Sequence, residues 1–184
     1  SIENTCNKGG GSIWYLQDIE EISAYRTSNH LPLHLDGARI YNALAAQGTS
    51  EAAMDAQFDS ISLCLSKGLG APIGSLLIGG KDFIKKARRI RKVLGGGMRQ
   101  VGYLAAAGIY ALDHHVDRLQ EDHRKAREMA AMLEEKSYVK HIKEVDTNIV
   151  IFELESDKEM KGFMDHLHSQ GIWTVSMGPQ TVRL

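Results

Sequence analysis

The segment FDSISLCLSKGLGAPIGS, residues 58–75, places one lysine, Lys67, between an alternating apolar run and a glycine-rich stretch. The alternation predicts a strand that runs up to Lys67, because every second side chain of a strand points to the same face. The glycines allow the backbone to come close to another group. A helix end with a solvated lysine is the alternative interpretation. The function of Lys67 therefore depends on what lies near it.

A second strand with a polar end precedes this one. LPLHLDGA, residues 31–38, has leucines at alternate positions and ends in Asp36 and Gly37, and ARIYNALAAQG, residues 38–48, predicts a short helix between the strands. Strands that alternate with helices form parallel sheets, and ligands bind beyond the carboxyl ends of such strands. We therefore expect Asp36 and Lys67 in one region. They either form a simple structural ion pair or take part in the chemistry of a site. His34, on the face of Asp36, either supports that carboxylate or packs.

The rest of the chain extends this α/β pattern. We expect a large domain over residues 1–115 and a connecting helix with part of a small α+β domain over residues 116–184. Periodicity predicts helices over 16–30, 101–115 and 113–136, and a basic helix from residue 81 that ends in the three glycines at 95–97. A short apolar run at 74–80 could continue the sheet. A strand at 147–154, a helix at 157–171 and two strands turned at 178–179 follow. The helix at 101–115 is apolar on nearly every side, so we expect it to be buried.

Composition excludes several classes of partner. The 184 residues are 43% apolar, and 22 basic against 23 acidic side chains give a net charge of -1, which favours neither nucleic acid nor an acidic membrane surface. The basic run at 85–92 lacks interleaved aromatic residues and fits a solvated helix face better. No apolar run reaches the roughly 20 residues that span a bilayer.

The cysteines and histidines indicate neither a metal site nor a disulfide framework. Cys6 and Cys64 lie far apart without ligand spacing, and His114, His115 and His123 lack dependable partners. We expect no metal, a reducing compartment and a cytoplasmic location. The chain begins without methionine and ends in an alternating stretch, so we expect a fragment.

Several motifs together resemble one enzyme family. The segments HLDGAR (34–39), SLCLSKGLGAPIGS (62–75), IENTCN (2–7), LGGGMRQ (94–100) and VRL (182–184) are similar to those of the low-specificity L-threonine aldolases. That resemblance implies fold type I, the PLP-dependent transferase-like fold, with pyridoxal 5'-phosphate (PLP) as the cofactor. It also implies cleavage of L-threonine or L-allo-threonine to glycine and acetaldehyde, and a homo-oligomer, dimer or tetramer.

The resemblance also implies roles for single residues. Lys67 would attach the cofactor covalently and Asp36 would contact its pyridine nitrogen, which matches the need of PLP for an amine at one end and a carboxylate at the other. We expect both side chains to be poorly solvated. Further roles are implied for Arg39 at the phenolic oxygen, Ser66 at the phosphate, Arg99 at the phosphate or in a neighbouring subunit's site, and Arg183 at the substrate α-carboxylate.

Alternatives remain open for each of these roles and for the activity. Arg39 could be a surface residue at a helix start, Arg183 a polar position of a strand, and Ser66 a structural residue. The chain departs from the family at Cys6, where relatives commonly carry histidine, and it lacks the family's N-terminal part with the phosphate loop and the histidine that stacks on the cofactor. A β-eliminating lyase or aminotransferase of the same fold, or a non-catalytic truncated homologue, is the alternative function.

Overall fold

A computed structural model of the chain describes residues 1–155 and 159–184, and these form two compact units. The first unit contains residues 1–5 and 13–120, and the second contains residues 6–12 and 121–184. The domains predicted above meet at residues 115 and 116, whereas the boundary between the units lies at residues 120 and 121, and the second unit also includes the short segment 6–12. Each unit has its own sheet and core.

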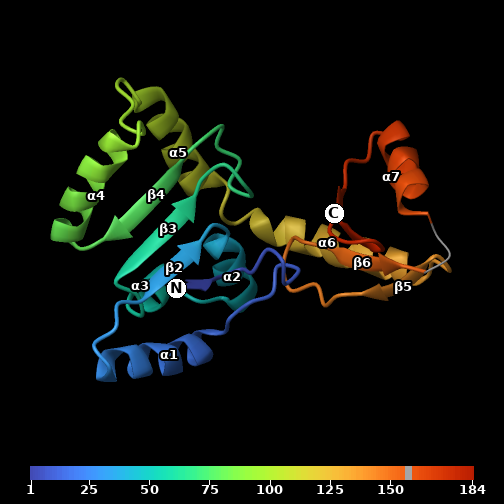
Figure 1. The fold of residues 1–184 in the computed structure, drawn as a ribbon, viewed down its shortest axis with the longest axis horizontal. Coiled ribbons are helices and arrows are strands. Elements are labelled where there is room, and N and C mark those ends of the chain that lie inside the picture. Colours follow the sequence, from blue (N-terminus) through green and yellow to red (C-terminus); the bar gives the residue numbers. More distant parts are fainter. Residues whose placement is uncertain (156–158) are drawn as a thin grey trace. The chain divides into compact units, whose positions relative to one another are not determined.

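The first unit is built from four strands and five helices among the described residues. Its elements are β1 (Ile2–Glu3), α1 (Leu16–Ser28), β2 (His34–Gly37), α2 (Ile40–Gln47), α3 (Glu51–Asp55), β3 (Ser60–Cys64), β4 (Ser75–Gly79), α4 (Lys81–Val93) and α5 (Gly102–His114). The sheet order is β1-β2-β3-β4 (Figure 1). Strands β1, β2 and β3 are parallel, and β4 runs antiparallel to β3. The predicted strands before Asp36 and Lys67 are therefore confirmed as parallel neighbours, and the apolar run at 74–80 does continue the sheet.

Local sequence explains why α2 and α3 begin and end where they do. Gly48 ends α2 with a φ of 65°, a conformation that glycine adopts without steric cost. The Ser50 hydroxyl then caps α3 by accepting the N–H of Ala53 at 3.3 Å. The two helices and α1 contribute Ile19, Ala43, Leu44 and Met54 to a core with β2 and β3.

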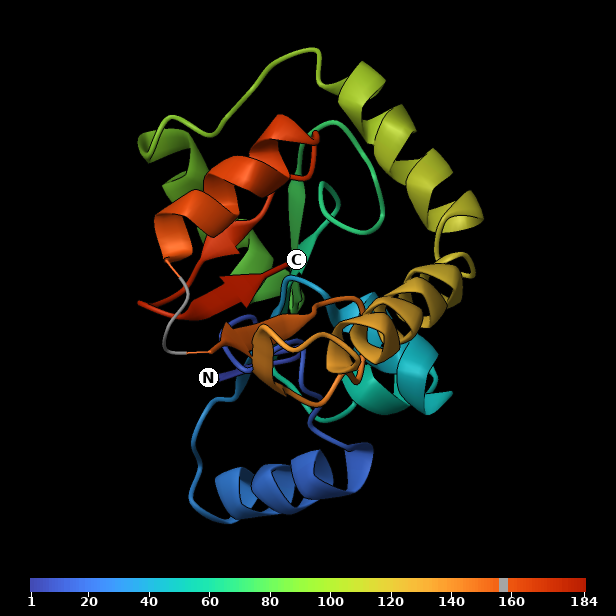
Figure 2. The same cartoon turned by 90° about the vertical axis from the view of Figure 1, so that its right-hand side faces the viewer.

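The second unit has an antiparallel sheet of order β5-β6-β8-β7. Its elements are α6 (Leu119–Glu134, which starts in the first unit), β5 (Val139–Ile142), β6 (Ile151–Leu154), α7 (Met160–Ser169), β7 (Val175–Ser176) and β8 (Thr181–Arg183). Phe152, Leu154 and Val182 are almost fully buried, and Met160 and Phe163 of α7 pack against them. Figure 2 shows α7 beside the strands β7 and β8 of this sheet. The predicted strand, helix and pair of strands are confirmed; residues 157 and 158 of the predicted helix lie outside the described residues.

Two helix predictions are wrong in part. Helix α5 is largely exposed rather than buried: Tyr103 is 91% exposed, and only Gly108 and Ala111 are buried. An apolar sequence identifies a surface that can be covered, but it does not supply the covering element. The helix predicted from residue 113 begins at Leu119. The basic helix predicted to end in the glycines at 95–97 is confirmed, since it ends at Val93, just before them.

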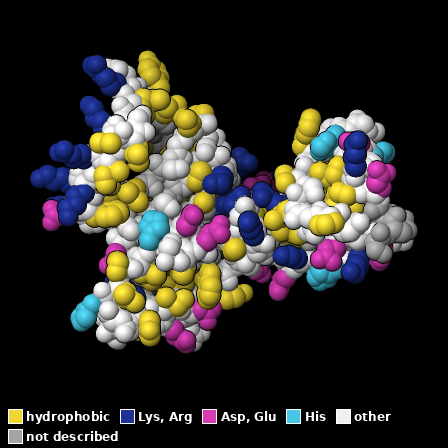
Figure 3. All heavy atoms as spheres, viewed as in Figure 1, with side chains coloured by type: hydrophobic (Ala, Val, Ile, Leu, Met, Phe, Trp, Pro, Cys, Tyr) yellow, Lys and Arg dark blue, Asp and Glu magenta, His cyan; other side chains and the backbone are white. Residues whose placement is uncertain are grey.

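Helix α4 carries its basic side chains on the surface. All of its lysines and arginines are exposed, and Figure 3 shows them beside hydrophobic side chains of the same region.

Among the described helices, none is long and apolar enough to cross a membrane.

Candidate active site

The carboxyl ends of β2 and β3 bring the predicted acid and the lysine loop to one edge of the sheet. Asp36 pairs in register with Ser62 of β3, and the loop with Lys67 follows β3 directly. Paired residues of neighbouring strands point to the same face, so Asp36 and Ser62 share a face. A Cβ at Gly37 would lie 2.9 Å from the carbonyl oxygen of Ser62, so only glycine allows this close approach after Asp36.

The carboxylate of Asp36 is oriented by its own turn. One oxygen accepts the backbone N–H of Ala38 at 3.2 Å, as an aspartate at a strand end commonly does. Arg39 follows as the residue before α2, and its carbonyl oxygen accepts the N–H of Asn42 at 2.9 Å. Arg39 therefore lies at the helix N-terminus, three residues after Asp36, and its side chain is half-buried.

Buried apolar side chains anchor the Lys67 loop. Leu65, Leu69 and Ala71 are 3–6% exposed, whereas Ser66 and Lys67 are exposed. The loop is closed by backbone bonds, because Gly70 donates to the carbonyl of Lys67 at 2.8 Å and Ala71 to that of Leu65 at 3.0 Å. Buried leucines thus flank the exposed pair Ser66 and Lys67.

A histidine that the sequence left without a role fixes this loop. The Nδ1 atom of His115, just after α5, lies 2.6 Å from the carbonyl oxygen of Leu69. A carbonyl oxygen only accepts, so the Nδ1 atom carries the proton and donates. His115 and Leu69 are 46 residues apart, and no local pattern indicates such a contact.

The pKa of the Cys64 thiol depends in part on the charge of Lys67. Burial, the largest single influence, raises the pKa of this thiol, but hydrogen bonds with Ser66 and Ser75 and the positive charge of Lys67 outweigh it, so the pKa is lowered. The Ser66 hydroxyl lies 3.4 Å from the Cys64 sulfur. The ammonium of Lys67 therefore acts electrostatically on the end of β3.

The loops after β2 and β3 pack closely together. They enclose a cavity of about 10 Å³ lined by residues 38–42, 63–64 and 68–69, which is space for about one water molecule. Asp36, Ser66 and Lys67 themselves are exposed. The expectation that Asp36 and Lys67 are poorly solvated is therefore wrong for this chain, because no described residue covers this edge.

The other two predicted arginines belong to other parts of the chain. Arg99 is exposed in the stretch between α4 and α5, and within the described chain no hydrogen bond or ion pair joins it to Asp36 or Lys67. Arg183 belongs to β8 in the second unit, where its Nη1 atom donates to the Oδ1 atom of Asn7 at 2.8 Å. Sequence reasoning missed Asn7, which lies 176 residues away.

His34 also has a different partner from the one considered above. Its Nδ1 atom lies 2.8 Å from the Ser60 hydroxyl, which is the register partner of His34 on β3. Two polar pairs, His34 with Ser60 and Asp36 with Ser62, therefore follow one another along the same face of the sheet.

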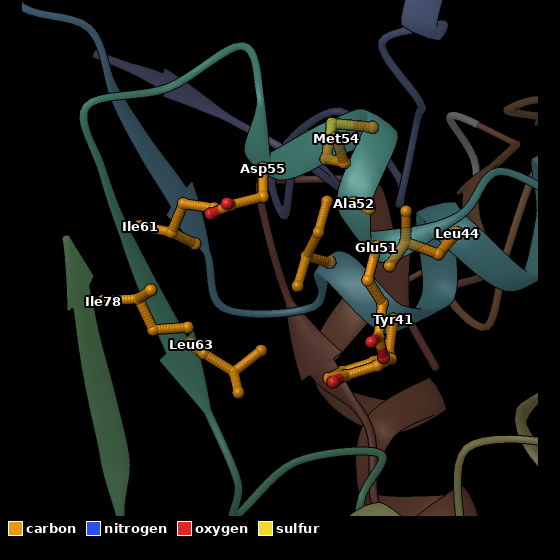
Figure 4. A pocket seen from close by; sticks show the side chains of 10 residues that line it. Tyr41, Leu44, Glu51, Ala52, Met54, Asp55, Ile61, Leu63 and Ile78 are labelled. Carbon is orange, nitrogen blue, oxygen red and sulfur yellow. The ribbon is translucent and has the colours of Figure 1, made fainter. Parts of the chain in front are cut away.

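A larger pocket lies on the opposite face of this sheet. It has a volume of about 440 Å³, and apolar side chains of α2, α3, β3 and β4 line it, including Ile61 and Leu63 (Figure 4). Ile61 and Leu63 alternate with Ser60 and Ser62, so this pocket does not open toward Asp36. At its rim, burial first and then the hydrogen bond and charge of Glu51 raise the pKa of Tyr41 to about 12.

Comparison with known proteins assigns the chain to a family. The family model described as beta-eliminating lyase matches residues 1–157. The chain belongs to the β-eliminating lyase family. Threonine aldolases and β-eliminating lyases depend on PLP. The resemblance noted from the motifs is thus confirmed at the level of the family and its cofactor.

Relatives of this β-eliminating lyase family member are threonine aldolases. The chain is 51% identical over 135 residues to the low specificity L-threonine aldolase of Escherichia coli, covering 73% of this chain and 40% of that protein. It is 42% identical over 158 residues to the low-specificity L-threonine aldolase of Candida albicans, covering 86% of this chain and 41% of that protein. The chain thus spans less than half the length of these two relatives.

Solved structures show the same fold. The threonine aldolase of Leishmania major matches with a TM-score of 0.78 at 24% identity, covering all of this chain and 54% of that one. The predicted fold, that of fold type I PLP-dependent enzymes, is confirmed for the part of the fold that this chain contains.

The residues at the sheet edge fit PLP chemically. An exposed primary amine, an exposed carboxylate fixed by a backbone N–H, a hydroxyl and a guanidinium follow two adjacent parallel strands. These are the groups that an aldehyde, a pyridine nitrogen, a phosphate and a phenolic oxygen require. Among the described residues, no cluster of His, Cys, Asp and Glu suited to a metal is present.

Proposed function

We propose that this chain is part of a PLP-dependent lyase that cleaves L-threonine or L-allo-threonine to glycine and acetaldehyde. One observation carries the proposal: parallel pairing of β2 and β3 sets Asp36 and the Lys67 loop at the same edge of the sheet. The names of the relatives supply the substrate, since both are threonine aldolases.

PLP, when bound, accepts the electron pair of the carbon bond that is broken. Lys67 would attach the cofactor through its amine and give way to the amino group of the substrate. Asp36 would hold a proton on the ring nitrogen, which its ionised carboxylate favours. Arg39 would contact the phenolic oxygen, and Ser66 would donate to the phosphate. Arg99 would serve the phosphate of this subunit or of a neighbouring one.

Arg183 would select the bond that breaks. Its planar guanidinium suits the two oxygens of the substrate α-carboxylate. Holding that carboxylate would orient the substrate, and orientation of this kind decides which of several competing reactions follows. With a base to take the proton of the β-hydroxyl group, the Cα–Cβ bond would break and release acetaldehyde, and a proton returned to Cα would give glycine.

The test is a product assay on the full-length protein loaded with PLP. Equal amounts of glycine and acetaldehyde from L-threonine are expected, and borohydride is expected to fix the cofactor on Lys67, as read by peptide mass spectrometry. Bound cofactor with neither product would overturn the aldolase assignment. Cofactor fixed on another lysine would overturn the role of Lys67.

A second candidate, β-elimination, is favoured by the description of the family model that matches residues 1–157. A β-eliminating enzyme would release an α-keto acid and ammonia from the same amino acid, so identification of the products separates the two. A homo-oligomer, dimer or tetramer, and a cytoplasmic location complete the proposal. The latter is supported by Cys6 and Cys64, which are free thiols.

A further inference from the structure

Asn7 and Arg183 form a contact in the second unit that the proposed function does not use. The Nη1 atom of Arg183 donates to the Oδ1 atom of Asn7 at 2.8 Å, and both side chains are half-buried. The distance is that of a strong hydrogen bond with a charged donor. The first question is whether each partner is held firmly enough for the contact to orient the guanidinium.

Arg183 is held through its strand. It lies on β8 between two neighbours, opposite Ile151 of β6 and Val175 of β7. The next residue, Leu184, exchanges backbone hydrogen bonds with Val150 at 2.9 and 3.5 Å. The backbone of Arg183 is therefore fixed from both sides. Only its long side chain has conformational freedom that binding of a ligand would remove.

Asn7 is held by a tight loop, residues 6–12. Cys6 donates to the carbonyl of Ser12 at 3.0 Å, Gly11 donates to that of Cys6 at 2.9 Å, and Gly10 donates to that of Asn7 at 3.3 Å. The loop is compact because a Cβ at Gly9 would lie 2.5 Å from the Ser12 hydroxyl oxygen.

A buried threonine ties this loop to the second unit. The hydroxyl of Thr147, which is 0% exposed, donates to the carbonyl oxygen of Gly11 at 2.8 Å. Gly11 has a φ of 78°, and a Cβ there would lie 2.4 Å from the Thr147 hydroxyl oxygen. Asn7 is thus presented to Arg183 by a loop that cannot easily shift.

The chemistry of the acceptor matters more than its position alone. An amide oxygen occupies one N–H direction of the guanidinium and leaves its positive charge intact. A carboxylate at the same place would neutralise that charge and compete with the carboxylate of a ligand. A neutral acceptor therefore suits an arginine that is to bind an anion.

We propose that Asn7 is a positioning residue for the carboxylate of the amino acid substrate, acting through Arg183. Its amide oxygen sets the orientation of the guanidinium before the substrate arrives, so that less side-chain freedom is lost on binding. This inference rests on the proposed role of Arg183 in the function above. Asn7 is therefore expected to affect the affinity for ligands that carry a carboxylate. It is not expected to affect contacts with other parts of the ligand.

The test compares ligands with and without a carboxylate on the PLP-loaded full-length protein. Glycine carries an amine and a carboxylate, and 2-aminoethanol carries the amine alone; binding of each is followed by the cofactor absorbance. We expect Asn7→Asp to weaken glycine at least about tenfold and Asn7→Ala about fivefold, with 2-aminoethanol unchanged. With L-threonine, KM is expected to rise while kcat changes little.

One further variant completes the design, and Asn7→Asp serves a second purpose. Asn29→Asp makes the same chemical change at an exposed asparagine of the first unit, so it controls for added negative charge. Asn7→Asp keeps an acceptor of the same size, so it preserves the fold if Asn7→Ala does not.

The outcomes separate this inference from the function on which it rests. If Arg183→Gln leaves glycine affinity unchanged, the role of Arg183 is wrong and Asn7 falls with it. If Arg183→Gln weakens glycine but neither Asn7 variant does, only the inference about Asn7 is overturned. Equal loss of glycine and 2-aminoethanol in the Asn7 variants would show a purely structural role and would also overturn it. Failure of the product assay leaves these binding results unaffected.

Discussion

The Nδ1 atom of His115 lies 2.6 Å from the carbonyl oxygen of Leu69, two residues after Lys67. This bond joins the end of α5 to the loop that carries the lysine. It explains how an exposed lysine can still have a defined place, because the loop beneath it is pinned by a side chain from a distant part of the chain.

Replacing this histidine is expected to loosen the cofactor. His115→Ala removes a hydrogen bond worth about 1 kcal/mol, so the Kd for PLP is expected to rise about fivefold. His115→Asn places an N–H near the position of Nδ1 and is expected to retain most of the affinity. Equilibrium dialysis of PLP measures both. An alanine variant that binds PLP as tightly as the parent would contradict the positioning effect.

Removing the charge of Asp36 is expected to reduce turnover and leave the fold intact. Asp36→Asn keeps the shape of the side chain but no longer favours a proton on the ring nitrogen, and a loss of about 10²–10³ in kcat is typical of such an electrostatic change. Because Asp36 is exposed, the free energy of unfolding is expected to change by no more than about 0.5 kcal/mol. Steady-state kinetics and urea unfolding measure the two effects, and unchanged turnover would disprove the role.

The thiol of Cys64 is expected to react at lower pH than an ordinary cysteine. Its pKa lies below the usual 9.0, partly because of the charge of Lys67. In cofactor-free protein with Cys6→Ser, the rate of alkylation by iodoacetamide should rise at a lower pH than in a model thiol. Lys67→Met removes the positive charge, so the rise should move to higher pH. A midpoint that does not move would show that Lys67 exerts no charge effect on Cys64.

Tyr41 is expected to make stability fall at alkaline pH. Its pKa in the folded protein is about 12 against the usual 10.0. Between these values the unfolded chain has lost the phenolic proton while the folded chain keeps it, so the stabilisation present below pH 10 is lost as pH rises toward 12. Glu51→Gln should lower the pKa of Tyr41 without returning it to 10.0, because burial is the larger cause. Ultraviolet titration of the phenol measures this, and an unchanged titration in Glu51→Gln would contradict it.

The loop anchor at Thr147 is expected to contribute to stability through its hydroxyl. Thr147→Val leaves the carbonyl oxygen of Gly11 without its donor and is expected to cost about 1–3 kcal/mol in the free energy of unfolding. Thr147→Ser keeps the donor and loses only a methyl group, about 0.8 kcal/mol. Denaturant unfolding measures the free energy of unfolding of the two variants. A greater loss of stability in Thr147→Ser than in Thr147→Val would contradict the role of the hydroxyl.

The part of the site that lies on regular strands could be predicted from the sequence. The alternation of apolar residues before Asp36 and before Lys67 is sufficient to predict that both lie at one edge of the sheet, since parallel strands separated by a helix end at the same edge. Strand β1, with two residues, and helix α3, with five, are too short to show a period, and β5 was also missed. Their formation depends on neighbouring strands and caps rather than on local pattern.

Contacts between distant residues could not be predicted. Nothing near His115 or Asn7 in the sequence indicates partners 46 and 176 residues away. The solvation of Asp36 and Lys67 was also predicted wrongly, since burial depends on what covers an edge and not on the residues that form it. Sequence reasoning thus identifies groups and edges better than it identifies their surroundings.

The exchange of residues 6–12 between the units limits how this protein can be dissected. Expressing 121–184 alone, or cleaving the backbone after Gln120, would deprive the C-terminal part of a seven-residue segment that is covalently joined to the N-terminal part. Thr147 would lose its acceptor and Arg183 its asparagine in one step. Truncation mapping at that bond would consequently underestimate both the folding competence of the C-terminal part and the anion affinity proposed for it.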